Sequence, residues 1–138
     1  MTVKSQNIDL LEVYSKEFSE DCVLERATLD EKLLMIPGIK AKYVTRLYRH
    51  KKEKEELGKL YVVALDKAVE ELVKTSQVKL SRPALEKAAH SHETVQKISE
   101  RIQDLSLLVD YLEKVVTTIS GIGYDIKNIV EWTKMELT

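Results

Sequence analysis

A heptad stripe in the last third of the chain constrains the fold more than any other sequence feature. Its apolar residues recur at alternating spacings of three and four, the pattern of a helix that packs along a seam. The stripe consists of Val95, Ile98, Ile102, Leu105, Val109, Leu112, Val116 and Ile119. A second apolar row, formed by Leu108, Tyr111 and Val115, lies beside it. The pattern predicts one long helix over residues 83–119.

Such a helix is too long to be covered by a compact globule. It would measure about 55 Å at 1.5 Å per residue. A compact chain of this length has a diameter of about 37 Å. We therefore expect a second long helix of the same chain to cover part of the stripe, and further copies of the chain to cover more. The oligomerisation residues predicted in this way are Leu105, Leu108, Val109, Leu112, Val115, Val116, Ile119, Ile122, Ile126 and Val130.

Composition favours an all-α fold of long antiparallel helices. Four glycines, two prolines and 33% charged residues suit long helices better than a β fold, and 43% hydrophobic residues provide a core. We predict a single helical domain over residues 1–138. Within it, residues 1–80 form the N-terminal helices, including the basic DNA-binding helix, and residues 81–138 form the C-terminal oligomerisation helices.

Proline and glycine positions suggest where the helices end. Pro37 disfavours helical backbone at Ile36, which predicts a kink or a break there. Gly121 and Gly123 predict an interruption after the heptad stripe. The expected helices cover residues 8–20, 28–36, 39–74, 83–119 and 124–132.

Charge is distributed unevenly along the chain. Residues 1–31 carry three basic and eight acidic residues, a net charge of −5, whereas residues 39–59 carry eight basic and three acidic residues, a net charge of +5. Spaced cations with an aromatic face among them are what a protein needs to bind single-stranded nucleic acid. The candidate DNA-binding residues are Lys40, Lys42, Arg46, Tyr48, Arg49, Lys51, Lys52, Lys54 and Lys59.

A purely structural interpretation competes with nucleic-acid binding. Charged runs on helices are commonly just solvated, and Glu53, Glu55 and Glu56 can pair with nearby lysines. The alternative is a structural coiled-coil or virion assembly protein that does not bind nucleic acid. Tyr43 and Tyr61 lie on the apolar face of the expected helix and suit core packing, whereas Tyr48 lies off that face and suits base stacking.

Neither an enzyme nor a metal protein is expected. No nucleophile has a base at a suitable spacing. His90 and His92, two residues apart, point away from each other on a helix and make a poor metal pair. We therefore predict no catalytic activity, no cofactor and no metal site.

Cysteine content and hydropathy predict a soluble protein of a reducing compartment. Cys22 is the only cysteine, so an intrachain disulfide is impossible. No apolar run approaches 18 residues, and the first residues do not form the apolar segment of a signal peptide. A cytoplasmic location without membrane contact is expected.

Four segments resemble one known family, the UvsY family of recombination mediator proteins from T-even-type and marine bacteriophages. They are an acidic-apolar segment, a proline-kinked helix entry, the late heptads and a final helix with the sequence Tyr-Asp-Ile-Lys-Asn-Ile-Val-Glu-Trp. These segments cover residues 21–29, 36–43, 109–116 and 124–132. Their order and spacing agree over nearly the whole chain.

The resemblance implies an all-helical subunit that forms a ring of the hexamer or heptamer class through its C-terminal helices. It implies binding to single-stranded DNA in recombination, repair and replication. The expected partners are a phage RecA-like recombinase, which the protein loads, and the single-strand-binding protein that it displaces. The setting would be the cytoplasm of the host cell.

One segment departs from the family pattern. Family members often carry a basic motif late in the charged helix, whereas residues 64–71 contain Lys67 as their only cation. The family's DNA contacts therefore cannot be transferred to residues 64–71, and the expected strand path lies earlier on the helix.

Overall fold

The computed structural model describes residues 3–75 and 79–137, with side chains from residue 10 onward. In chain order the elements are α1 (Val3–Asp21), the short 3-10 helix η1 (Arg26–Thr28), α2 (Leu29–Thr75), α3 (Arg82–Ala89) and α4 (Glu93–Glu136). The residues in these two ranges form no strand, so the predicted all-α class is confirmed. None of the described helices is both long and apolar enough to cross a bilayer.

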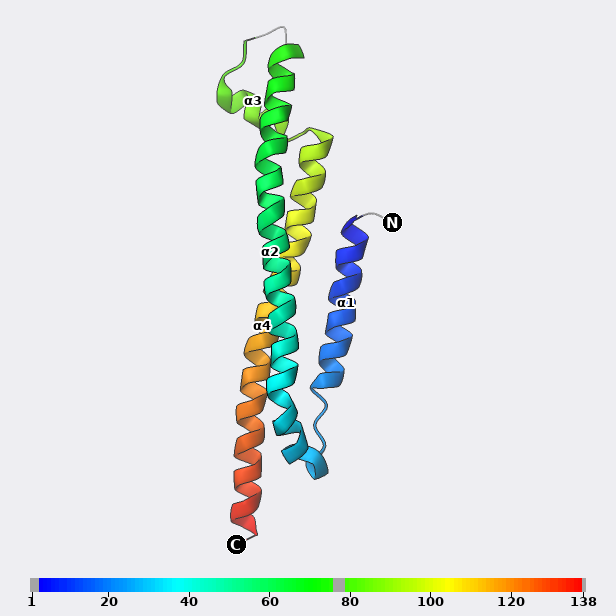
Figure 1. Cartoon of the computed structure of the whole chain (residues 1–138), viewed down its shortest axis with the longest axis vertical. Coiled ribbons are helices and arrows are strands. Elements are labelled where there is room, and N and C mark those ends of the chain that lie inside the picture. Colours follow the sequence, from blue (N-terminus) through cyan, green and yellow to red (C-terminus); the bar gives the residue numbers. More distant parts are fainter. Residues whose placement is uncertain (1–2, 76–78, 138) are drawn as a thin grey trace.

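The two longest helices lie antiparallel along the long axis of the molecule (Figure 1). Helix α1 runs beside the α2–α4 pair, and α3 lies at the end where α2 finishes. The last turns of α4 extend beyond the beginning of α2 (Figure 1). The expected long antiparallel helices are therefore present, and the molecule is a narrow bundle.

The heptad stripe of α4 forms the main core. Its buried residues pack against Tyr43 and Leu47 of α2, and half-buried side chains of α1 cover them from the other side. This core contains Leu105, Leu108, Val109, Leu112, Val115 and Ile119. A second cluster, formed by Ala68, Val69, Leu85, Ala89 and Val95, holds α3 against the end of α2. As expected, Tyr43 is a core residue.

The helix break expected at Pro37 is absent. Helix α2 continues from Leu29 to Thr75 with Pro37 inside it, and its first turns lie at an angle to the rest (Figure 1). Proline removes one backbone donor and crowds the carbonyl four residues earlier, which bends a helix without ending it when the flanking turns are held. The prediction of a kink is confirmed, whereas separate helices over residues 28–36 and 39–74 are wrong.

The prediction of one unbroken helix over residues 83–119 is also wrong. Helix α3 ends at Ala89, and α4 begins at Glu93. His92 caps α4, since its Nδ1 atom accepts a hydrogen bond from the Thr94 amide at 3.2 Å. The turn over residues 90–92 lets Leu85 and Ala89 fold onto α2.

The interruption expected at Gly121 and Gly123 is likewise absent. Helix α4 passes through both glycines to Glu136, so residues 124–132 are no separate helix. Neither glycine has a positive φ angle. A β-carbon at position 123 would lie 3.3 Å from Cγ2 of Ile36. Gly123 therefore lets α4 approach α2 closely.

Candidate nucleic-acid interface

The basic half of α2 presents some of its cations to solvent. Tyr48 is 64% exposed, and Lys52 and Lys59 follow it by four and eleven residues, which places all three on one side of the helix. Arg49 lies exposed next to Tyr48. Within residues 3–75 and 79–137, no ion pair involves Arg49, Lys52 or Lys59. We call Tyr48, Arg49, Lys52 and Lys59 the outer-face track.

The other predicted cations differ in exposure and pairing. Lys51 pairs with Glu113 of α4 at 3.0 Å, and its ammonium lies 5.5 Å from the centre of the Tyr48 ring. Lys54 is half-buried, whereas Lys40 is exposed. Lys51 is therefore already paired with a carboxylate, and its ammonium already contacts the Tyr48 ring.

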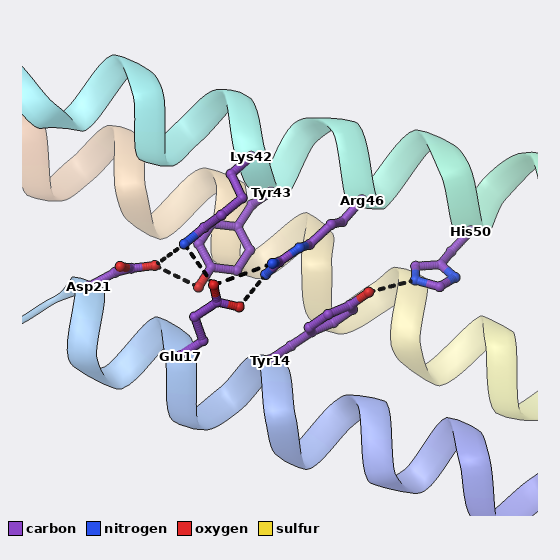
Figure 2. Close-up of polar contacts among 7 residues, drawn as sticks. All are labelled: Tyr14, Glu17, Asp21, Lys42, Tyr43, Arg46 and His50. Atoms are coloured by element: carbon purple, nitrogen blue, oxygen red, sulfur yellow. Dashed lines mark hydrogen bonds and ion pairs between the residues drawn. The ribbon is translucent and has the colours of Figure 1, made fainter.

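Lys42 and Arg46 are paired with carboxylates of α1 (Figure 2). The Lys42 ammonium donates to Glu17 at 3.0 Å and to Asp21 at 2.7 Å. The Arg46 guanidinium donates to both oxygens of Glu17, at 2.5 and 3.3 Å. We call these four residues the α1 latch. Two of the predicted DNA-binding cations are thus occupied within the chain.

Aromatic rings complete the latch. The Arg46 guanidinium lies 4.6 Å from the ring centre of Tyr14 and 5.3 Å from that of Tyr43. Tyr43 donates a hydrogen bond to Asp21 at 2.8 Å, and Phe18 meets the Tyr43 ring edge-on. The latch therefore combines charge pairing with ring contacts (Figure 2).

The pairing is reflected in shifted pKa values. The hydrogen bonds from Arg46 and Lys42 lower the pKa of Glu17 below its ordinary value. The bond to Glu17 raises the pKa of Arg46. Burial acts to lower the pKa of Lys42, but its bonds to Asp21 and Glu17 outweigh burial and raise it. Burial, followed by the bond to Asp21, raises the pKa of Tyr43. The shifts of Glu17, Lys42 and Arg46 all favour the charged forms of these side chains.

His50 lies inside the bundle and does not face a ligand. Only 9% of it is exposed. Its Nε2 atom shares a hydrogen bond of 3.1 Å with the hydroxyl of Tyr14, and its Nδ1 atom lies 3.3 Å from Glu53. Glu53 also pairs with Arg101 of α4. Both ring nitrogens of His50 therefore take part in a polar chain that links α1, α2 and α4.

A comparison with protein families identifies the relationship. The family model described as "Recombination, repair and ssDNA binding protein UvsY" matches residues 17–137. The chain belongs to the UvsY family. This confirms the resemblance inferred from the four segments. The match includes both the outer-face track and the α1 latch. No curated protein sequence matches the chain.

Solved structures support the same fold for this UvsY-family chain. Three crystal structures of the recombination mediator protein UvsY of bacteriophage T4, in lattice types IV, II and I, have TM-scores of 0.80, 0.80 and 0.78. Their identities to this chain are 18%, 17% and 19%. They cover 91%, 92% and 88% of this chain and 98%, 97% and 97% of their own chains.

The predicted oligomerisation residues of this UvsY-family chain lie mostly inside its own bundle. Val116, Ile122 and Val130 are half-buried and the other seven are buried. The buried residues are Leu105, Leu108, Val109, Leu112, Val115, Ile119 and Ile126. Since α1 and α2 of the same chain cover much of this stripe, its role in assembly stays a prediction.

Sequence reasoning missed an exposed apolar surface near the end of α4. Tyr124 is 68% exposed, Ile129 44% and Trp132 67%. Ile129 and Trp132 are three residues apart and share a helix face. We call Ile129 and Trp132 the C-terminal apolar surface; Tyr124, five residues before Ile129, faces another side of the helix. Their type and spacing were visible in the sequence, but the prediction chose Ile122, Ile126 and Val130 from this segment instead.

Proposed function

We propose that this UvsY-family chain is a recombination mediator that binds single-stranded DNA as a homo-oligomeric ring. It helps load a phage RecA-like recombinase onto strands covered by single-strand-binding protein, in the cytoplasm of the host, and has no catalytic activity of its own. The observation that carries the proposal is the family match over residues 17–137. The similar T4 structures are those of a recombination mediator protein, which favours the proposal.

The outer-face track supports strand binding. Three cations that form no ion pair among the described residues, next to an exposed tyrosine, provide phosphate neutralisation and a ring for stacking. One subunit with so few cations binds weakly at physiological salt. A ring repeats the track along one strand, and the linked contacts raise the overall affinity. Assembly and strand binding therefore belong to one mechanism.

The C-terminal apolar surface supports assembly. Exposed aromatic and aliphatic side chains grouped on one element are typical of protein interfaces. These side chains are exposed on the last part of α4, which extends beyond the beginning of α2 (Figure 1). Together with the half-buried Val116, Ile122 and Val130, they form the surface that we assign to contacts between copies.

Two assays test the function. Binding of the unmodified protein to oligo(dT) is measured across a salt series, and we expect affinity to fall steeply with salt as counterions are released. Loading of the recombinase onto oligo(dT) covered by single-strand-binding protein is then measured with and without the chain. Faster loading is the expected result. Failure to bind oligo(dT) even at low salt would favour the structural assembly protein instead.

A further inference from the structure

We infer that α1 is a displaceable mask that withholds Lys42 and Arg46 from DNA until a strand competes for them. The inference deepens the proposed function and rests on it, because it concerns the regulation of the same basic helix. Its basis is the juxtaposition of the Glu17 and Asp21 carboxylates with these two cations. In the masked state a strand meets only the outer-face track.

The masked cations continue the line of an exposed one. Lys42, Arg46 and Arg49 follow one another by four and three residues, so they lie along one stripe of α2. Arg49 is exposed without an ion pair in the described ranges, whereas its two neighbours on the stripe hold carboxylates. A strand bound at Arg49 therefore brings phosphate oxygens next to the latch. Phosphate and carboxylate then compete for the same donors.

The latch is built so that it can open. Its side chains are 22–33% exposed, and ion pairs that solvent can reach are weakly stabilising and are screened by salt. A phosphate that replaces a carboxylate keeps the cation paired, and the released carboxylate is solvated once α1 moves away.

The attachment of α1 to the bundle is shallow. None of its described side chains, from residue 10 to 21, is fully buried. Its apolar contacts come from Leu10, Leu11, Tyr14 and Phe18, which stay half-buried where they pack against the main core. A short non-helical segment at residues 23–25 joins α1 to η1 (Figure 1). Helix α1 can therefore move at this joint while the α2–α4 core stays packed.

Removing the latch charges tests the mask. The latch variant is Glu17→Gln with Asp21→Asn. The control variant is Glu12→Gln with Glu20→Gln, which removes the same net charge from exposed positions of the same helix. Oligo(dT) affinity is measured for both across a salt series, and helix content and molar mass are compared with those of the unmodified protein. We expect the latch variant to bind at least about threefold more tightly than the control. Its salt slope should be steeper by about 0.7 per added phosphate contact.

Removing the cations in two backgrounds separates masking from a general charge effect. Lys42→Gln with Arg46→Gln should abolish the gain of the latch variant. In the unmodified background the same pair should change affinity less than twofold, because there each phosphate contact is gained only by giving up a carboxylate contact. The inference is overturned if the latch and control variants bind equally. It is also overturned if the cation pair weakens binding equally in both backgrounds.

Hydrogen exchange can be measured on the unmodified protein, so its result does not depend on how any variant folds. Oligo(dT) should speed amide exchange in residues 12–21 if α1 is displaced, since an undocked helix frays. Slower or unchanged exchange there would overturn the mask.

Failure of the mask is distinguishable from failure of the proposed function. If strand binding needs Arg49, Lys52 and Lys59 but the latch variant behaves like its control, only the mask is wrong. If the unmodified protein does not bind oligo(dT), both are wrong.

Discussion

Gly123 of α4 packs closely against Ile36 of α2. A β-carbon added to Gly123 would lie 3.3 Å from Cγ2 of Ile36. Gly121, two residues earlier, has open space around it. Both residues are helical. Packing therefore disfavours a side chain at position 123 but not at position 121, so substitutions at the two positions can be compared directly.

Replacing each glycine by alanine should separate these roles. Gly121→Ala should raise the free energy of unfolding by about 0.5–1 kcal/mol, the helix-propensity difference between the two residues. Gly123→Ala gains the same propensity but forces Ile36 to move, so its net effect should be smaller or destabilising. Urea unfolding of both variants at one protein concentration measures the difference. Equal stabilisation by both would show that the contact with Ile36 has no energetic weight.

The pKa of Glu17 predicts a specific pH dependence of stability. Because its pKa is lowered in the folded state, its contribution is complete above the ordinary value of 4.5 and is lost as pH falls through the lowered value. Glu17→Gln should cost up to about 1 kcal/mol at pH 7, since the pair is partly solvated. The cost should shrink as pH falls below 4.5. Urea unfolding over a pH series measures it, with Glu12→Gln as control. A cost independent of pH would contradict the charge pairing.

Tyr48 should contribute to strand binding through its ring. Tyr48→Ala should weaken oligo(dT) binding by about 1–3 kcal/mol per stacked base, whereas Tyr48→Phe should leave binding nearly unchanged. Fluorescence anisotropy of labelled oligo(dT) measures both. If the two variants lose affinity equally, the hydroxyl matters and stacking does not.

The C-terminal apolar surface should hold copies of the chain together. Replacing Ile129 and Trp132 by glutamate would place charges where apolar contact is expected. The double variant should keep its helix content but form a smaller particle in light scattering. Val62→Glu with Val73→Glu, at exposed positions of α2, is the control. An unchanged molar mass would exclude this surface. Leu112 gives no clean test, since it is fully buried within the subunit.

Local periodicity was enough to predict the buried face of α4. The alternation of three and four brings Leu105, Leu112 and Ile119 to one side of any helix, whatever packs there. The core position of Tyr43 follows from the same argument. These features were predictable because they depend on residues close together in the sequence.

The features that sequence reasoning missed depend on distant partners. Lys42 and Arg46 appeared free for DNA because Glu17 lies 25 and 29 residues away from them, and no local pattern brings α1 alongside. Pro37 and Gly121 carry strong local signals for helix ends, yet tertiary packing keeps both inside helices. The capping role of His92 depends on a turn that the heptad pattern concealed.

The most direct test of the central claim is the salt dependence of strand binding when the outer-face track is removed. The track variant replaces Arg49, Lys52 and Lys59 by glutamine. The control also replaces three lysines by glutamine, at exposed positions near the end of α2 and in or before α3. These are Lys74, Lys79 and Lys87. Oligo(dT) affinity of both is measured from low to high salt. We predict a large loss for the track variant, with a salt slope flatter by about 0.7 per lost phosphate contact, and little change for the control. Equal losses, or none in the track variant, would contradict strand binding along this face of α2.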